Sequence, residues 1–213
     1  MIVDEHIRDY LFSLDGELPQ FLAELEDRAL AQGVPIIRRD TQSVLKFLIR
    51  KEKPEAVLEI GTAVGFSALF MLEFLPEGAH ITTIEKVGMR LKEARKNLAG
   101  KDRITLIEAD ATEALEQLVL SGRKFDMIFL DAAKGQYGSW LEQILKLLEK
   151  GGLLVTDNCL LDGSIAESKF AIERRDRTIH KRMREYLYEI THSEMLDTVI
   201  LPTGDGLAVS CRL

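Results

Sequence analysis

Short apolar runs alternate with helical stretches along most of the chain from residue 56 onwards. Aliphatic and β-branched runs of this length are typical of strands buried on both faces, and helices between them predict right-handed crossovers onto a parallel sheet. The predicted strands are AVLEI (56–60), HITTIE (80–85), ITLIEA (104–109), FDMIFLD (125–131) and GLLVTDN (152–158).

The two ends of the chain depart from this alternation. Amphipathic helices are predicted at residues 2–14, 19–32 and 41–50, with Asp40 as the N-cap of the third. Residues 195–213 predict two strands joined by a Gly-Asp-Gly turn, which leaves no room for a crossover helix. One of those two strands must therefore be antiparallel.

These elements predict an α/β fold in a single domain, residues 1–213. Residues 1–50 form a helical cover, and residues 55–213 form the core. The predicted sheet has seven strands, mostly parallel with one antiparallel strand in a C-terminal hairpin, and helices on both faces. This Rossmann-like pattern resembles class I methyltransferases more than a dinucleotide-binding fold.

Composition disfavours several classes of protein. No run approaches the roughly 18 apolar residues of a membrane span, and the charged N-terminus is unlike a signal peptide, so a cytoplasmic protein is expected. Cys159 and Cys211 are too few for a disulfide framework or a cysteine-built zinc site, and both are expected to be buried thiols. The net charge of −7 disfavours polyanion binding overall, but a local basic patch can override it because salt screens distant charges.

A glycine turn follows the first predicted strand, in the sequence LEIGTAVGFSALF. Gly61 and Gly65 allow a sharp turn and the close approach of a ligand. The spacing is G-x-x-x-G with Glu59 two residues earlier, and a pyrophosphate would gain nothing from that acid. Many such turns carry glycine for steric reasons alone, so the loop by itself is a weak signal.

Acidic residues end three successive predicted strands, at Glu59, Glu85 and Asp110. Ligands bind outside the carboxyl ends of parallel strands, so these acids predict a nucleoside site. Glu85 would accept hydrogen bonds from ribose hydroxyls, and Asp110 with Ala111 would face an adenine. The alternatives are solvated strand ends, or a nicotinamide-dependent dehydrogenase, which would need phosphate donors that this loop lacks.

A second set of polar residues follows the fourth and fifth predicted strands. Asp131 ends one strand, Asp157 and Asn158 end the other, and neighbouring strands bring these ends together. Two carboxylates and an amide oxygen form the hard ligand set that magnesium or calcium takes, and the four histidines show no ligand spacing. The competing interpretation is a capped turn followed by an Asx turn.

The D-x-x-K motif of Asp131 and Lys134, followed by the Asp157-Asn158 pair, resembles the catechol O-methyltransferase-like, metal-dependent methyltransferases. The resemblance extends from about residue 34 to the end of the chain. It implies S-adenosylmethionine and magnesium as cofactors, Asp131, Asp157 and Asn158 as metal ligands, and Lys134 and Asp131 as catalytic residues. Lys134 would take the proton of a hydroxyl made acidic by the metal. The implied cofactor contacts are Ile37, Glu59, Gly61, Thr62, Gly65, Ser67, Glu85, Asp110, Ala111 and Asp131.

Five sequence blocks resemble one branch of that family, the bacterial tRNA 5-hydroxyuridine methyltransferases. This resemblance implies conversion of 5-hydroxyuridine to 5-methoxyuridine at the wobble position of tRNA, with the anticodon region as partner. It also implies a homodimer formed through the N-terminal helices. The blocks are VPI (34–36), LEIGTAVGFSA (58–68), FLDAAKGQY (129–137), TDNCLLDG (156–163) and GDGLAVS (204–210).

Residues 169–184, which we call the basic segment, carry seven Lys or Arg against two acids. Such a cluster suits phosphate contacts, although a solvated helix face is the other explanation. Tyr137 and Trp140 either stack on a base or pack against the sheet. The predicted RNA contacts are Arg38, Arg39, Arg174, Arg175, Arg177, Lys181 and Arg182.

Two other functions stay open. The same site would serve an O-methyltransferase of small catechol-like or CoA-linked phenols. A non-catalytic RNA-binding protein could also have a methyltransferase fold without its chemistry.

Overall fold

The computed structural model describes residues 2–213, and within them the chain divides into two compact units. We call residues 5–114 the N-terminal unit. We call residues 115–213, together with residues 2–4, the C-terminal unit. The grouping of the whole chain into one domain stays a prediction.

In the N-terminal unit, the three predicted strands pair in parallel, the first with the second and the second with the third. Apolar side chains of these strands are buried, and the helix after the glycine turn packs against the second and third N-terminal helices. The strands are β1 (Ala56–Ile60), β2 (His80–Glu85) and β3 (Ile104–Glu108), and the helices are α1 (Glu5–Leu14), α2 (Gln20–Ala31), α3 (Arg39–Glu52), α4 (Phe66–Phe74) and α5 (Gly88–Asn97).

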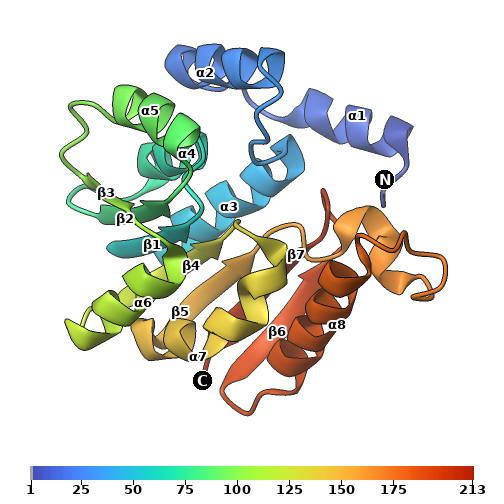
Figure 1. Cartoon of the computed structure of the whole chain (residues 1–213). Coiled ribbons are helices and arrows are strands. Elements are labelled where there is room, and N and C mark those ends of the chain that lie inside the picture. The colour runs from blue at the N-terminus through green and yellow to red at the C-terminus, as the bar shows by residue number, and fades with distance from the viewer. Residues whose placement is uncertain (1) are drawn as a thin grey trace. The chain divides into compact units, whose positions relative to one another are not determined.

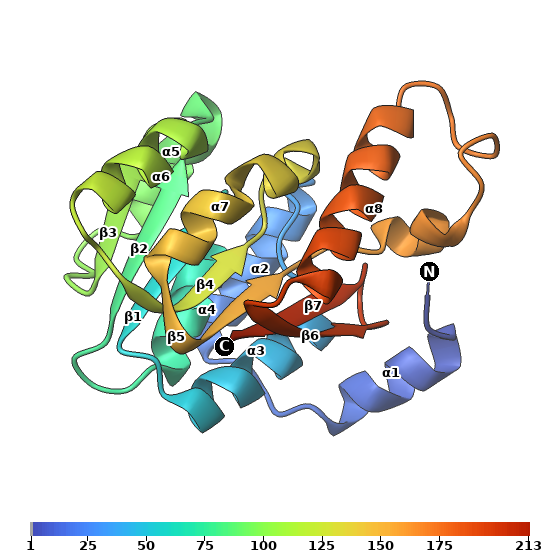
Figure 2. The ribbon, with the colours of Figure 1, turned by 90° about the horizontal axis from the view of Figure 1, so that it is seen from below.

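The C-terminal unit contains the predicted hairpin. Helices α7 (Tyr137–Leu147) and α8 (Arg177–His192) pack side by side against its strands, as Figures 1 and 2 show. Two short 3-10 helices, η1 (Lys134–Gln136) and η2 (Leu161–Ala166), follow the strand ends. The strands are β4 (Phe125–Leu130), β5 (Leu148–Thr156), β6 (Leu196–Leu201) and β7 (Leu207–Arg212), and α6 (Ala111–Leu120) begins in the N-terminal unit.

The strand order is β3-β2-β1-β4-β5-β7-β6 in a seven-stranded sheet. β4 and β5 are parallel, whereas β7 runs antiparallel to both β5 and β6. The predicted fold class is thereby confirmed, including the single antiparallel strand in a C-terminal hairpin. The apolar pattern was sufficient for this because a short turn between β6 and β7 cannot return the chain for a parallel strand.

Two local predictions were wrong. Helix α3 has Arg38 as its N-cap, not Asp40, because the Gln42 N–H already donates to the Arg38 carbonyl at 2.8 Å and starts the helical hydrogen bonding there. Cys159 is a buried free thiol as expected, but Cys211 lies near the end of β7 and is only half-buried.

Among the described residues, no helix has both the length and the apolar character needed to cross a membrane. The cytoplasmic location stays a prediction.

Candidate active site: a cofactor cluster and a metal cluster

The predicted site residues fall into two groups. We call the group in the N-terminal unit the cofactor cluster. It comprises Ile37, Glu59, Gly61, Thr62, Gly65, Ser67, Glu85, Asp110 and Ala111. We call the group in the C-terminal unit the metal cluster, which comprises Asp131, Lys134, Asp157 and Asn158. Asp131, which was also predicted to contact the cofactor, therefore belongs to the unit of the metal cluster.

The glycine turn of the cofactor cluster has the backbone that its sequence predicts. Gly61 has a φ of 109°, and Gly65 has a φ of 87° as the N-cap of α4. A Cβ atom at Gly65 would lie 3.1 Å from a methyl group of Leu98, so both conformation and space favour glycine there. Ala63, between them, also has a positive φ of 46°, which is a strained conformation for a residue with a side chain.

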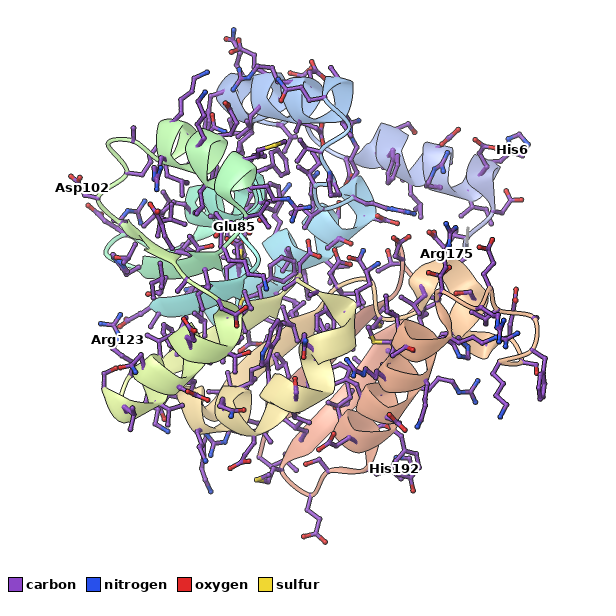
Figure 3. The ribbon with its side chains drawn as sticks, viewed as in Figure 1. His6, Glu85, Asp102, Arg123, Arg175 and His192 are labelled. Carbon is purple, nitrogen blue, oxygen red and sulfur yellow. The ribbon has the colours of Figure 1, made fainter. Side chains whose placement is uncertain are left out.

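Glu85 fastens this turn to the end of β2. Its Oε2 accepts a hydrogen bond of 2.9 Å from the Ala63 N–H, and its Oε1 accepts bonds from the Lys86 and Val87 N–H groups. A carboxylate has about four acceptor positions, so three of them are filled by backbone donors. Glu85, labelled in Figure 3, therefore shapes the loop, and its predicted contact with a ribose would use the remaining position.

A buried polar chain connects β1, β2 and the glycine turn. The Thr83 hydroxyl donates to the carboxylate of Glu59, and the hydroxyls of Thr62 and Thr83 are 2.6 Å apart. Glu59 is 0% exposed, and the two threonines are also fully buried. The sequence analysis missed Thr83 because a threonine in mid-strand gives no signal beyond β-propensity. The register of β1 with β2 places it directly opposite Glu59.

Asp110 combines a structural role with its predicted one. It accepts a hydrogen bond from the Thr112 N–H at the start of α6, and it pairs with the Lys86 ammonium at 2.8 Å. The hydrogen bond from Lys86 lowers the pKa of Asp110, and the Thr112 backbone bond contributes to this. Ile37 and Ser67 are buried in the same unit. Their contacts with a cofactor stay predictions.

The metal cluster contains a crowded carboxylate. Asp157 is 2% exposed, directly after β5, and its N–H donates to the Leu130 carbonyl at the end of β4. Burial raises the pKa of Asp157 to about 7, and the negative charges of Asp131 and Asp205 add to this rise, whereas Lys134 opposes it. The charged form of the buried Asp157 is therefore disfavoured beside the half-buried Asp131, although Lys134 and the Asn158 N–H partly offset this.

Asp205 is a residue that the sequence analysis missed. Its carboxylate accepts a hydrogen bond of 3.3 Å from the Asn158 side-chain amide, and Asp205 is itself 8% exposed. The Cys159 and Leu160 N–H groups donate to the carbonyls of Gly206 and Asp205, which fixes the two loops together. The Gly-Asp-Gly motif was interpreted only as a turn, although an acid between two glycines was the available signal.

Asn158 has a φ of 57°, a left-handed conformation that asparagine tolerates better than most residues. Because its amide nitrogen is bonded to Asp205, the amide oxygen is left as the group that can bind a cation. This observation favours a ligand role over a simple Asx turn.

The donor set fits a hard divalent cation. The carboxylates of Asp131 and Asp157, the first of which raises the pKa of the second, match together with an oriented amide oxygen the oxygen ligands of magnesium or calcium. Within residues 2–213, no group of three or more His, Cys, Asp or Glu side chains is arranged to hold a metal ion. The cation would therefore depend on the amide and on water or substrate oxygens to complete its coordination.

Lys134 begins η1, and helix α8 contacts that turn. The guanidinium of Arg182 donates to the Gly135 carbonyl at 3.0 Å, which holds η1 beside the metal cluster. Lys134 contributes a positive charge that lowers the pKa of Asp157, so the amine and the carboxylate lie close enough to interact. The role of Lys134 as a base stays a prediction.

Tyr137 and Trp140 pack in the interior, so the stacking alternative is wrong. Tyr137 is fully buried, its hydroxyl bonds to the Ala132 backbone, and its ring meets that of Tyr186 edge to face at 5.6 Å. Trp140 is 5% exposed. Both face inward because α7 turns its apolar side toward β4 and β5.

The predicted RNA contacts belong to both units. Arg39 forms an ion pair with the buried Glu26 at 3.1 Å, and Arg38 is the N-cap of α3. In the C-terminal unit, Arg175 is paired with Glu173 and Asp176. Arg177, Lys181 and Arg182 lie on α8 and line a pocket there. The role of these residues in RNA binding stays a prediction.

Comparison with known proteins adds an independent observation. A family model described as O-methyltransferase matches residues 13–213. A catechol O-methyltransferase from Niastella koreensis is 33% identical over 171 residues, which is 78% of this chain and 76% of the relative.

Two solved structures have a fold similar to that of this chain. A provisionally named caffeoyl-CoA O-methyltransferase from Staphylococcus aureus is similar with a TM-score of 0.86 and 30% identity, covering 98% of each chain. An O-methyltransferase from Bacillus cereus in complex with SAH has a TM-score of 0.85 at 21% identity, covering 98% of this chain and 97% of its own.

Proposed function

Because the chain belongs to the O-methyltransferase family, we propose that it transfers the methyl group of S-adenosylmethionine to a hydroxyl that has a second oxygen beside it. The metal cluster is the observation that carries this proposal. Its crowded Asp157, its oriented Asn158 and its nearby Lys134 form a site for a cation next to a base. Two adjacent acceptor oxygens suit such a site, since chelation fixes the direction of the nucleophile.

The cofactor cluster supports S-adenosylmethionine as the methyl donor. Its glycine turn allows close approach, and its acids suit a nucleoside with no phosphate. The fully buried carboxylate of Glu59 favours a ligand with a positive charge, such as the ammonium or sulfonium of the methionine part. The Bacillus cereus O-methyltransferase with SAH bound supports the same choice.

In the proposed reaction, Asp131, Asp157 and Asn158 would hold a magnesium ion. When bound, the cation supplies positive charge that stabilises the acceptor as an oxyanion. Lys134, in its neutral amine form, would take the hydroxyl proton at its Nζ atom. Asp205 keeps the Asn158 amide turned so that its oxygen, and not its nitrogen, faces the ligand. A bound S-adenosylmethionine would supply the methyl carbon, with the carbon–oxygen bond forming in line as the carbon–sulfur bond breaks and S-adenosylhomocysteine leaving as a neutral thioether.

The relatives favour a small catechol-like or CoA-linked phenol as the acceptor. Two relatives are named after acceptors of this class. One is the catechol O-methyltransferase from Niastella koreensis, and the other is the provisionally named caffeoyl-CoA O-methyltransferase from Staphylococcus aureus. This acceptor class is the first candidate.

A second candidate acceptor is 5-hydroxyuridine in tRNA, with 5-methoxyuridine at the wobble position as the product. Two observations favour it: the five sequence blocks, and the basic segment in a chain with a net charge of −7. Its 5-hydroxyl and 4-carbonyl also present two adjacent oxygens to the cation.

One assay separates these acceptors. Transfer from labelled S-adenosylmethionine is measured to 3,4-dihydroxybenzoate, to caffeoyl-CoA and to tRNA isolated from cells that lack this gene. Preference for either phenol would reject the tRNA acceptor, and preference for the tRNA would reject the phenols. No transfer to any of them, with or without magnesium, would contradict the proposed function.

Two variants test the non-catalytic alternative. Lys134→Ala and Asp157→Ala remove the predicted base and a predicted ligand. If tRNA modification persists in cells that carry each of the two variants, the metal cluster does no catalysis.

We also propose a homodimer through the N-terminal helices. Helix α1 has no buried residue and exposes Ile7, Tyr10, Leu11 and Leu14, an apolar set that a second copy could cover. Light scattering is expected to give twice the monomer mass. A Leu11→Glu/Leu14→Glu variant is expected to give the monomer mass, and an unchanged dimer would contradict this interface.

A further inference from the structure

Helix α8 and the chain just before it enclose a pocket in the C-terminal unit that the proposed chemistry does not use. Its volume is about 850 Å³. It lies within a single unit, so its lining does not depend on the rest of the chain. The lining residues are Glu167, Ser168, Lys169, Arg177, Thr178, His180, Lys181, Arg182, Arg184 and Glu185.

The charge of this lining is strongly positive. Five Lys or Arg side chains face two Glu, although the chain as a whole is acidic. Arg177 and Arg184 each donate one N–H to a backbone carbonyl, of Ile172 and of Ile165, at 3.0 Å. A guanidinium has five N–H donors, so these bonds hold the side chains in place and leave further donors for a ligand.

His180 is a second, independent observation. It is only 3% exposed, yet it lines the pocket, and its Nε2 atom has no hydrogen-bond partner within residues 2–213. Buried polar atoms in proteins are nearly always bonded. A ligand oxygen in the pocket would supply the missing partner, because an imidazole N–H can donate to it.

We propose that this pocket binds a phosphate group of the methyl acceptor. The proposal rests on the proposed function and narrows its substrate class to acceptors that carry phosphate. RNA and CoA thioesters share that chemistry, whereas a bare catechol lacks it. Phosphate is the natural ligand for several fixed guanidiniums together with a buried imidazole.

The structure also divides the basic segment. Arg174 and Arg175 are outside the pocket, and Arg175, labelled in Figure 3, is already paired with Glu173 and Asp176. A diffuse basic surface would use all of the cations alike. Lys181 is itself 3.6 Å from Glu185, so the division rests on the lining: a phosphate in the pocket would contact Lys169 and Lys181 but neither Arg174 nor Arg175.

The test compares two charge-matched double variants. Lys169→Gln/Lys181→Gln removes two charges from the pocket, and Lys92→Gln/Lys96→Gln removes two exposed charges from α5. Binding of a fluorescent RNA stem-loop, and of CoA in competition with a fluorescent CoA conjugate, is measured by anisotropy. The pocket variant is expected to lose about tenfold or more in affinity for RNA, for CoA or for both, with a smaller salt dependence for RNA. The α5 variant is expected to stay within about twofold.

The ligand that loses affinity identifies the source of the phosphate. Unchanged binding of both probes by the pocket variant would overturn the proposal. An equal loss in Arg174→Gln/Arg175→Gln would overturn it too, in favour of a diffuse surface. These readouts need no methyl transfer, so the pocket and the proposed reaction can fail separately.

Two His180 variants and one kinetic comparison complete the test. His180→Leu is expected to keep the fold and weaken binding of the affected probe about tenfold, and His180→Gln, which retains an N–H donor, is expected to restore part of it. Full affinity in His180→Leu would contradict the assignment of the imidazole. With 3,4-dihydroxybenzoate as acceptor, the Lys169→Gln/Lys181→Gln variant is expected to keep its KM within about twofold. A rise of KM for 3,4-dihydroxybenzoate as large as the rise for a phosphate-bearing acceptor would also overturn the proposal.

Discussion

The acidic side chains of the cofactor cluster and those of the metal cluster have opposite environments. In the cofactor cluster, the Glu85 carboxylate accepts three backbone N–H bonds, and Asp110 is paired with Lys86. In the metal cluster, Asp157 is buried beside the negative charge of Asp131, and its pKa rises to about 7. Donor groups and an ammonium thus stabilise the charged forms of Glu85 and Asp110, whereas burial and neighbouring negative charge disfavour the charged form of Asp157 even though it accepts a hydrogen bond from the Asn158 N–H.

This difference indicates what each cluster is ready to bind. Acids already fixed by backbone donors give a preorganised surface, which binds a nucleoside with little rearrangement. Burial and the negative charge of the half-buried Asp131 disfavour the charged form of Asp157, and a divalent cation would relieve both effects. The four predictions below test that distinction, beginning with the largest expected effect.

Asp157→Ala is expected to disable the metal cluster and leave the cofactor cluster intact. Loss of the charge stabilisation that a metal supplies predicts a fall in kcat/KM of about 10³-fold. Transfer from labelled S-adenosylmethionine to the preferred acceptor measures this fall, and calorimetry is expected to give an unchanged Kd for S-adenosylhomocysteine. Asp197→Asn, which removes an exposed carboxylate on β6, is the control. A Kd that rises as steeply as kcat/KM falls would show that the clusters are not separable.

Lys134→Ala is expected to lower kcat by about 10² to 10³-fold, the usual contribution of a general base. Lys134→Arg is not expected to restore activity, because a guanidinium keeps its proton. A pH profile is the decisive measurement, since the Ala variant should regain activity as rising pH ionises the acceptor hydroxyl without help. Equal pH profiles for the variant and the natural protein would argue against a base at this position.

Asp157→Asn tests, through the pH dependence of Tm, whether the charged form of Asp157 is disfavoured in the folded protein. In metal-free protein, the folded-state pKa of about 7 lies above the ordinary value of 3.8. The protonated carboxyl of Asp157 thus contributes to the free energy of unfolding. This contribution is complete below the ordinary pKa of 3.8 and is lost as the pH rises through the folded-state pKa of about 7. We expect the Tm in EDTA to fall by several degrees between about pH 5 and pH 8 in the natural protein, and to fall less in Asp157→Asn.

The same Tm measurement with added magnesium tests whether a cation binds at Asp157. Protons and the cation compete for Asp157, so added magnesium should raise the Tm more at pH 8 than at pH 5. Asp157→Asn should lose most of that increase. Equal stabilisation at both pH values would contradict a cation bound at this carboxylate.

Glu85→Gln is expected to have the smallest effect and to act on the cofactor cluster alone. Its amide NH₂ would face backbone N–H donors, which costs about 1 to 3 kcal/mol and predicts a roughly tenfold weaker Kd for S-adenosylhomocysteine. The magnesium-dependent rise in Tm should be unchanged. Asp102→Asn, an exposed substitution in the same unit (Figure 3), is the control, and loss of the magnesium effect in Glu85→Gln would contradict independent clusters.

The positions of the strands along the chain were predictable because their apolar runs are bounded by turn residues and separated by helices. The proximity of Asp131 to Asp157 was predictable from the same pattern, since each acid directly follows a strand and β4 pairs with β5. Asp205 was not predictable as a partner of Asn158, because the two are 47 positions apart and only the hairpin brings them together. Nor did charge alone show which basic residues line the pocket.

The sequence by itself determined where the strands run and which side chains stand at their ends, because alternation of apolar and polar residues is a local property of the chain. The tertiary structure alone decided which acids are satisfied and which are crowded. A carboxylate's proton affinity depends on burial and on charges that lie far away in sequence, and neither is set until the chain has folded.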